Sequence, residues 1–226
     1  MRRCPPGGLL SGRAALGFFG NVAAISATPN PTLAWLRPLS ALVLALLLAA
    51  CVPSGPQFKN TDVTGADCCR DFRLTDHTGT PRTLADFRGK VVVVFFGYTQ
   101  CPDVCPTTMV EIKDVLQRLG ADAKRVQVLF ITVDPERDTR ELLASYVPAF
   151  DPDFLGLYGD AGATARTAKE FRIFYQKQAG SSPSNYTVDH TAGSYVFDPR
   201  GQVRLFVRHG RAENLVEDLR TLLKQG

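Results

Sequence analysis

Residues 90–119, KVVVVFFGYTQCPDVCPTTMVEIKDVLQRL, decide how the rest of this 226-residue chain is interpreted. The run 90–96 is apolar, β-branched and aromatic, which is typical of a strand buried on both faces of a sheet. After it, apolar residues recur at the spacing of one helix face until Gly120. These positions are Val104, Met109, Ile112, Val115, Leu116 and Leu119. Two cysteines, Cys101 and Cys105, therefore lie in a turn between a buried strand and the start of a helix.

The flanking segments alternate between predicted strands and helices without an internal repeat, so we expect residues 67–226 to form one domain. The expected strands are 125–134, 154–159 and 173–177, the expected hairpins are 71–84 and 194–209, and the expected helices are 138–147, 161–172 and 212–225. A loop rich in Ser, Pro and Asn is expected over 178–186. A cysteine motif between a central strand and a helix is the layout of a thioredoxin-like α/β fold. We expect a central mixed sheet flanked by helices, with an additional N-terminal hairpin.

The net charge of +4 comes from the N-terminal segment alone. The first 50 residues contain four arginines and no acidic residue, and residues 52–226 contain 22 basic and 22 acidic residues. A domain with no net charge has no electrostatic basis for binding nucleic acid, so this class of partner is excluded.

The N-terminal segment has the pattern of an export signal. Residues 38–50 are apolar but fewer than the roughly 20 that a spanning helix needs, which suits the core of a secretory signal. The segment ends in LAAC, residues 48–51, which resembles a bacterial lipobox in which Cys51 is lipidated. We therefore predict a signal segment over 1–51 and a flexible tether over 52–66. The alternative is an uncleaved signal anchor in which Cys51 is a spare thiol.

The CPDVC motif has three possible roles: a redox disulfide, a metal site, or two unused thiols. Residues four apart at the start of a helix share one face, so both sulfurs can point at the same spot. The helix N-terminus favours negative charge there, and soft thiolates select soft ions such as copper(I). Two sulfurs leave a metal undercoordinated, so a metal site needs a third ligand elsewhere.

Three histidines are candidates for that ligand. His77 falls in the turn of the predicted N-terminal hairpin and His209 at the end of a strand, where we expect both to be solvated. His190, in TVDHTAGSYVFD, lies where a polar loop meets a buried strand, a position at which loops present functional side chains. A hydrogen-bonded loop histidine fits the same pattern.

Three stretches together resemble the Sco (SenC) family of copper-binding assembly factors for cytochrome c oxidase. They are residues 71–109, ITVDPERDT at 131–139 and VDHTAGSYVFDPRGQ at 188–202. The resemblance covers about residues 61–226. It implies a membrane-anchored, outward-facing thioredoxin-like domain that binds copper through Cys101, Cys105 and His190. It also implies an acidic position near the site, which maps onto Asp134. The alternative for Asp134 is an ordinary turn aspartate before a helix.

The resemblance implies a copper metallochaperone that delivers copper(I), or copper(II) with an added oxygen ligand, to the dinuclear centre of cytochrome c oxidase subunit II. Handing over metal is not turnover, so we do not expect an enzyme. The alternatives are a thiol–disulfide oxidoreductase that uses Cys101 and Cys105 on the acceptor cysteines, and a copper or redox sensor. Other periplasmic copper chaperones are expected partners. We expect a lipid-anchored protein on the periplasmic face of the inner membrane.

Cys68 and Cys69 depart from the family pattern. Adjacent cysteines seldom form a disulfide with each other, because the ring is strained. The interpretations are incidental thiols, a weaker copper site, a redox relay to the CPDVC motif, or an intermolecular bridge.

Overall fold

The computed structural model describes residues 55–182 and 185–225. The predicted signal segment, the lipidation site at Cys51 and the first residues of the predicted tether lie outside these ranges. Within them, no helix is both long and apolar enough to cross a bilayer.

Three parallel strands form the centre of the sheet: β4 (Val91–Gly97), β5 (Val126–Thr132) and β6 (Leu155–Tyr158). All seven residues of both β4 and β5 are buried. Helices and loops cover both faces of such strands, which is why their sequences are mostly apolar.

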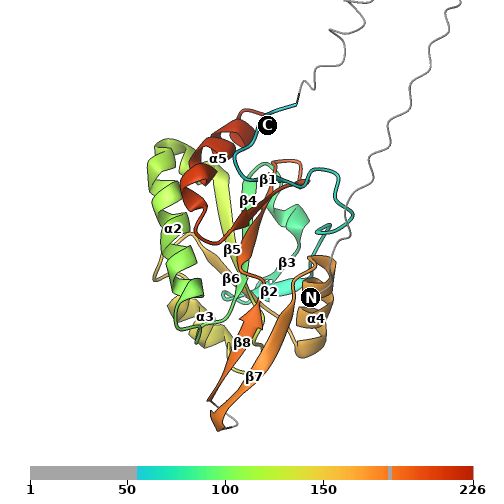
Figure 1. Ribbon diagram of the computed structural model, residues 1–226, viewed down its shortest axis with the longest axis vertical. Helices are drawn as coiled ribbons and strands as arrows, with labels where there is room; N and C mark the ends of the chain where they lie inside the picture. Colours follow the sequence, from blue (N-terminus) through green and yellow to red (C-terminus); the bar gives the residue numbers. More distant parts are fainter. Residues whose placement is uncertain (1–54, 183–184, 226) are drawn as a thin grey trace, which may run out of the picture. The chain divides into compact units, whose positions relative to one another are not determined.

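Antiparallel strands extend this centre in both directions and make the sheet mixed (Figure 1). On one side β9 (Gly193–Phe197) pairs with β4, and β10 (Val203–Arg208) and β1 (Thr61–Asp62) follow. On the other side β2 (Leu74–Asp76) pairs with β6 and β3 (Pro81–Arg82) with β2, which gives the predicted N-terminal hairpin. The strand order is β1-β10-β9-β4-β5-β6-β2-β3.

Helices cover both faces of the sheet. α2 (Val104–Leu119), α3 (Arg140–Tyr146) and α5 (Leu215–Leu223) lie on one face, and α4 (Ala161–Glu170) lies on the other (Figure 1). Short 3-10 helices complete the connections: η2 (Leu84–Phe87), η3 (Gly120–Arg125) and η4 (Ala212–Asn214). Thr139 caps α3, because its side chain accepts a hydrogen bond from the Leu142 amide.

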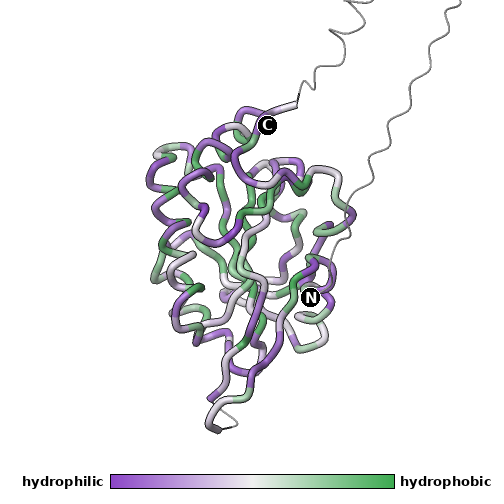
Figure 2. Tube along the Cα trace, viewed as in Figure 1, coloured by the Kyte–Doolittle hydropathy of each residue, from purple (hydrophilic) through white to green (hydrophobic). Residues whose placement is uncertain are grey.

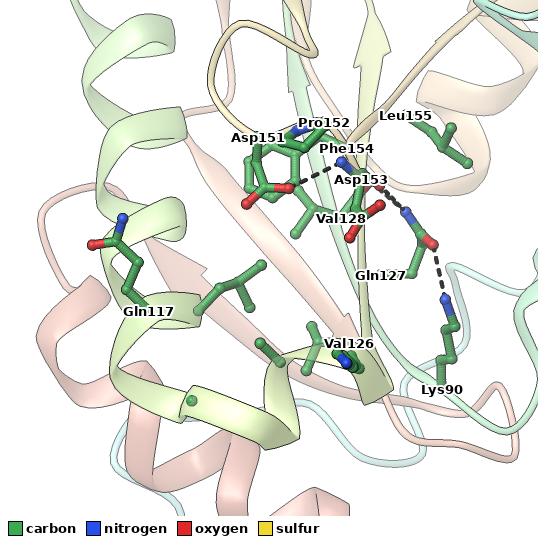
Figure 3. A pocket seen from close by; sticks show the side chains of 14 residues that line it. Lys90, Gln117, Val126, Gln127, Val128, Asp151, Pro152, Asp153, Phe154 and Leu155 are labelled. Carbon is green, nitrogen blue, oxygen red and sulfur yellow. Dashed lines mark hydrogen bonds between the residues drawn. The ribbon is translucent and has the colours of Figure 1, made fainter.

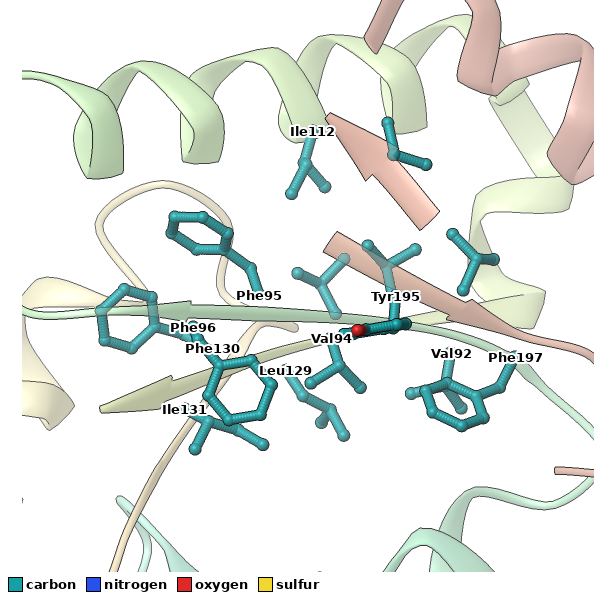
Figure 4. Packing of buried hydrophobic residues seen from close by; sticks show 14 of the residues in the cluster. Val92, Val94, Phe95, Phe96, Ile112, Leu129, Phe130, Ile131, Tyr195 and Phe197 are labelled. Carbon is teal, nitrogen blue, oxygen red and sulfur yellow. The ribbon is translucent and has the colours of Figure 1, made fainter. Parts of the chain in front are cut away.

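The core consists of aromatic and branched side chains on both faces of the central strands (Figure 4). Phe95 of β4 contacts Phe130 of β5 beneath α2, and Phe96 contacts Phe171 at the end of α4. In Figure 2 the hydrophobic stretches follow these central strands, and the helices alternate between hydrophobic and hydrophilic residues along their length. The strand that precedes the cysteine motif is thus held from both sides.

The polar loop expected over 178–186 was a wrong prediction. Residues 178–182 and 185–186 belong to a two-stranded antiparallel sheet of β7 (Tyr175–Ser182) and β8 (Asn185–His190), visible as a projecting hairpin in Figure 1. Most of β7 is exposed, so its composition carries no hydrophobic signal and the backbone pairing alone defines it. In β8, Tyr186 and Val188 are buried between exposed neighbours, a period of two that marks a half-buried strand.

Part of the segment predicted to be a flexible tether, residues 52–66, is bonded to the folded domain. Residues 61 and 62 pair with β10, and the backbone amides of Lys59 and Asn60 donate to the Asp218 carboxylate at 2.7 and 2.9 Å. These hydrogen bonds are made by backbone amides, which every residue except proline has. The small and polar side chains of the segment therefore gave no sign of them. Residues 59–62 are therefore attached to the folded domain.

Candidate metal centre

The cysteine loop connects the end of β4 to the first turn of α2. The loop begins with a tight turn, in which the Cys101 amide donates to the Tyr98 carbonyl at 3.2 Å. α2 begins at Val104, so Cys105 lies in its first turn. Cys105 is fully buried and Cys101 half-buried. The site therefore has one sulfur inside the domain and one at its surface.

His190 approaches the two sulfurs from the end of β8. Its Nε2 lies 3.5 Å from the Cys105 Sγ, and the three ligand atoms of Cys101, Cys105 and His190 all lie within 4.8 Å of one another. The His190 Nδ1 lies 3.2 Å from the Thr191 carbonyl. Because a carbonyl only accepts, Nδ1 carries a proton, and Nε2 is the ring nitrogen that faces the sulfurs. The rings of Tyr98 and Phe95 contact the imidazole edge-on.

The two thiols share one proton. The hydrogen bond from the Cys105 thiol, helped by His190 and opposed by burial, lowers the pKa of Cys101 to about 3. The pKa of Cys105 is raised by the same hydrogen bond and by burial. At neutral pH the pair holds one thiolate and one thiol. A soft cation that replaces the shared proton meets two sulfurs and an imidazole nitrogen.

Asp138 anchors the start of the cysteine loop through hydrogen bonds. This role was not predicted from the sequence. Asp138 is the first residue of the predicted helix 138–147, but α3 begins later, with Thr139 as its cap, and Asp138 is buried. Its carboxylate accepts hydrogen bonds from the backbone and hydroxyl of Thr99 and from the hydroxyl of Thr132. Burial raises the pKa of Asp138, although these hydrogen bonds oppose the shift. The carboxylate therefore fixes the start of the loop to β5.

Asp134 is buried and contacts the hairpin that carries His190. Its carboxylate accepts from the Tyr186 hydroxyl at 2.7 Å and forms an ion pair with Arg137 at 2.5 Å. Asp134 is not in the group of potential metal ligands. Asp134 therefore helps to fix β8, the strand that ends at His190.

Arg137 joins the hairpin to the cysteine loop, and nothing in the sequence had singled it out. Its Nη1 donates to the Gln100 side chain at 3.0 Å and to the Tyr186 carbonyl at 2.9 Å. Its guanidinium lies 3.5 Å from the centre of the Tyr186 ring. One side chain thus contacts the loop next to Cys101 and the strand that ends at His190.

The other two histidines are hydrogen-bonded away from this centre. The His77 Nδ1 accepts from the Gly156 amide at 3.0 Å, and the His209 Nδ1 lies 2.8 Å from the Thr108 hydroxyl. Both side chains are half-buried, so the expectation that they are solvated was wrong. Among residues 55–182 and 185–225, the group of Cys101, Cys105 and His190 is the one cluster that could hold a metal ion.

A hollow of about 630 Å³ lies at the opposite end of the sheet (Figure 3). Residues at the end of α2 and the starts of β5 and β6 line it, and Lys90, Gln127 and the Asp153 carbonyl form a hydrogen-bonded chain within it. Its lining contains no cysteine or histidine. This hollow therefore offers no soft ligand for a metal ion.

A family model described as SCO1/SenC matches residues 60–224. Over 153 residues the chain is 40% identical to the mouse "Protein SCO2 homolog, mitochondrial", which covers 66% of this chain and 60% of that protein. The human "Protein SCO1 homolog, mitochondrial" is 36% identical over 133 residues, which is 58% of this chain and 44% of that protein. The chain thus spans less than two thirds of the length of these relatives.

Solved structures with the same fold include ScoI of Bradyrhizobium japonicum with copper bound. It is 40% identical, with a TM-score of 0.63, and covers 68% of this chain and 98% of that one. Yeast Sco1 with copper bound is 30% identical, also with a TM-score of 0.63, over 69% of this chain and 88% of that one. These neighbours confirm the predicted thioredoxin-like α/β class, with its mixed sheet and flanking helices.

Proposed function

This chain belongs to the SCO1/SenC family, and on that basis we propose that it binds copper through Cys101, Cys105 and His190 as a metallochaperone for cytochrome c oxidase assembly. The observation that carries the proposal is the convergence of these three side chains within 4.8 Å. Two relatives of the same fold were solved with copper bound.

The ligand set suits copper in both oxidation states. Two sulfurs and one imidazole nitrogen match the soft copper(I) ion, and a water or other oxygen in a further position accommodates copper(II). The thiolate of Cys101 is already formed, and binding displaces the proton held by Cys105. The residues present therefore fit the ion.

Delivery follows from the unequal exposure of the ligands. Cys101 is half-exposed, so an incoming thiolate reaches the metal from that side while Cys105 still holds it. The proposed acceptor is the dinuclear copper centre of cytochrome c oxidase subunit II, and other periplasmic copper chaperones would supply the metal. Each transfer exchanges one sulfur ligand for another without net redox change.

The proposed location is the periplasmic face of the bacterial inner membrane, with a lipid on Cys51. The support is the lipobox-like LAAC at 48–51 after an apolar run. Residues 52–58 would then link the lipid to residue 59, where the chain joins the domain.

The lowered pKa of Cys101 favours a second candidate function, a thiol–disulfide oxidoreductase that reduces the acceptor cysteines. A thiolate at neutral pH with a second thiol beside it is the reactive form of a redox dithiol. This reaction does not need His190, whereas retention of copper does. The histidine therefore separates the two functions.

The test is the amount of copper(I) retained per chain after anaerobic loading and desalting of the full chain in detergent. We expect one tightly held copper in the wild type and loss of it in Cys101→Ser/Cys105→Ser and in His190→Ala. His209→Ala and Cys68→Ser/Cys69→Ser are the matched controls, because they remove the same types of side chain outside the cluster. Unchanged retention in His190→Ala would overturn the ligand set and favour the oxidoreductase.

A further inference from the structure

Cys68 and Cys69 form a second pair of thiols, apart from the copper site. Their side chains are only 9% and 1% exposed, and the two sulfurs lie 2.9 Å apart. Successive side chains of an extended chain point to opposite sides, which normally keeps neighbouring thiols apart. Cys69 instead has a φ of 61°, in the left-handed region that residues other than glycine seldom adopt. This conformation turns both thiols to the same side.

Hydrogen bonds to the end of α4 hold this unusual backbone in place. The Cys69 amide donates to the Glu170 carbonyl at 3.0 Å, and the Arg70 amide donates to the Glu170 carboxylate at 2.8 Å. The Arg172 guanidinium donates to the Asp67 carbonyl at 2.9 Å. The segment is thus fixed on both sides of the pair, and the sulfurs stay close in the folded protein.

The geometry suits a disulfide better than a metal ion. Two sulfurs that bind one ion at about 2.3 Å each are roughly 4.6 Å apart when they lie on opposite sides of it. The observed 2.9 Å is much shorter and lies closer to the bond length of about 2.0 Å in a disulfide. No further His, Cys, Asp or Glu among residues 55–182 and 185–225 completes a metal cluster with this pair. The weaker copper site considered from the sequence is therefore not supported.

An open cavity beside the pair gives reagents access to it. The cavity measures about 400 Å³, and both cysteines line it together with residues 64–66 and 201–203. Cys68 is the more exposed thiol. Burial, together with the hydrogen bond to Cys68, raises the pKa of Cys69. Cys68 is thus placed to attack an incoming reagent, and Cys69 to react second.

The sheet separates this pair from the copper site. Cys69 lies beside Tyr195, whose ring contacts Phe171 on the α4 face of the sheet. A Cβ at Gly97 would meet Cys105, Phe95 and Phe130, which places Cys105 on the α2 face. Sulfurs on opposite faces of a packed sheet cannot exchange bonds directly, so the structure does not support a redox relay between the pairs.

We propose that Cys68 and Cys69 are a second redox-active site, which reacts with low-molecular-weight disulfides to form a vicinal disulfide. The Cys68 thiolate attacks the reagent RSSR, forms a mixed disulfide and releases one RS⁻. Cys69 then attacks the Cys68 sulfur, releases the second RS⁻ and gives up its proton. In sum, two thiols and RSSR give one protein disulfide and two RSH, and two electrons pass from the pair to the reagent.

The test is a titration of the metal-free full chain with glutathione disulfide, followed by alkylation, trypsin digestion and mass spectrometry. The tryptic peptide 60–70, NTDVTGADCCR, contains both thiols. In the folded protein we expect this peptide to be two hydrogen atoms lighter and to carry no alkyl group. In urea, where nothing holds the sulfurs together, we expect to need about tenfold more oxidant for the same product.

Single variants test the order of the two steps. Cys69→Ser leaves Cys68 to accumulate the mixed disulfide with glutathione, and Cys68→Ser leaves Cys69 unmodified. The peptide with Cys101 and Cys105 is the internal control for oxidant strength. The proposal is overturned if both thiols in the folded chain are still alkylated once that control peptide is oxidised. It is also overturned if folded and unfolded chains form the ring equally well.

Discussion

Gly97 is the residue with the least room for change near the copper site. A Cβ there would lie 2.9 Å from the Cys105 sulfur and from a ring carbon of Phe130, and 3.0 Å from Phe95. These contacts are shorter than packed atoms allow, and the neighbours belong to a filled core. The close approach of the β4 backbone to Cys105 therefore requires glycine.

We accordingly expect Gly97→Ala to destabilise the fold by about 1–3 kcal/mol and to displace the Cys105 sulfur. Urea unfolding and copper per chain are the measurements. Gly55→Ala is the control, because a Cβ at Gly55 meets nothing within 4 Å. Wild-type stability and copper content in Gly97→Ala would contradict the packing described for this site.

The shared proton at the two cysteines predicts the pH dependence of alkylation. Because the pKa of Cys101 is about 3, its thiolate persists as the pH falls, and metal-free Cys101 should react with iodoacetamide at a nearly constant rate down to about pH 5. An ordinary thiol slows about tenfold per pH unit below its pKa of about 8.5.

Cys105→Ser removes the thiol that makes the largest contribution to this shift. In that variant we expect the alkylation rate of Cys101 to fall with pH well above pH 5. A wild-type profile that already declines between pH 8 and pH 7 would show that the thiolate is not stabilised in this way.

At the scale of the elements, the hairpin β7–β8 determines the position of His190, the third proposed ligand. β8 is paired with β7 and not with the main sheet, so side chains such as Tyr186 and Arg137 attach it to the domain. Hydrogen bonds to charged groups contribute about 1.5–3 kcal/mol each. The position of His190 therefore depends on these polar contacts together with the packing of the buried Tyr186 and Val188 side chains.

Arg137→Lys keeps the charge but loses the planar group that contacts Gln100 and Tyr186 together. We expect about tenfold weaker copper(I) binding in competition with a chelator, while Cys101 and Cys105 still bind. Thr187→Ala is the control on the same hairpin, because this side chain is exposed on β8. Equal copper(I) affinities of Arg137→Lys and the wild type would show that these Arg137 contacts do not control the position of His190.

The elements differ in how much of them the sequence could reveal. The central strands and α2 were predictable, because burial on both faces or one face leaves a periodic apolar pattern. β7 left no such pattern, because seven of its eight residues are exposed. The same holds for individual residues. The spacing of Cys101 and Cys105 indicates a shared site in the sequence itself. Asp138 and Arg137 could not be predicted, because their hydrogen-bond partners come close only in the folded chain. His190 was identified through resemblance rather than pattern.

At the scale of the whole molecule, Asp76 makes stability depend on pH. Burial raises the pKa of Asp76, but hydrogen bonds from Thr78, Arg82 and Thr80 outweigh it and lower the pKa from 3.8 to about 2. A carboxyl with a depressed folded pKa stabilises the fold above its unfolded pKa, and this contribution is lost as the pH falls toward 2. The shift corresponds to about 2 kcal/mol for this fully buried group.

We expect Asp76→Asn to be less stable than the wild type at pH 6, with the difference shrinking between pH 4 and pH 2. Urea unfolding across this range measures it, with the exposed Asp114→Asn as the matched control. A difference that stays constant down to pH 2 would mean that the charge of Asp76 does not contribute.

His190 lies far from the other two proposed ligands in the sequence, so a metal ion can bind all three only when the chain is folded. Cys105 and His190 are 85 positions apart, yet their sulfur and nitrogen lie 3.5 Å apart. An ion bound to both is a cross-link that closes this long loop, and a covalent link across such a loop lowers the entropy of the unfolded chain by the equivalent of roughly 4–5 kcal/mol. A chain that has not yet folded offers only the two neighbouring thiols. Full coordination therefore marks a molecule whose topology is already complete, and we expect the loaded form to resist unfolding more than the metal-free form.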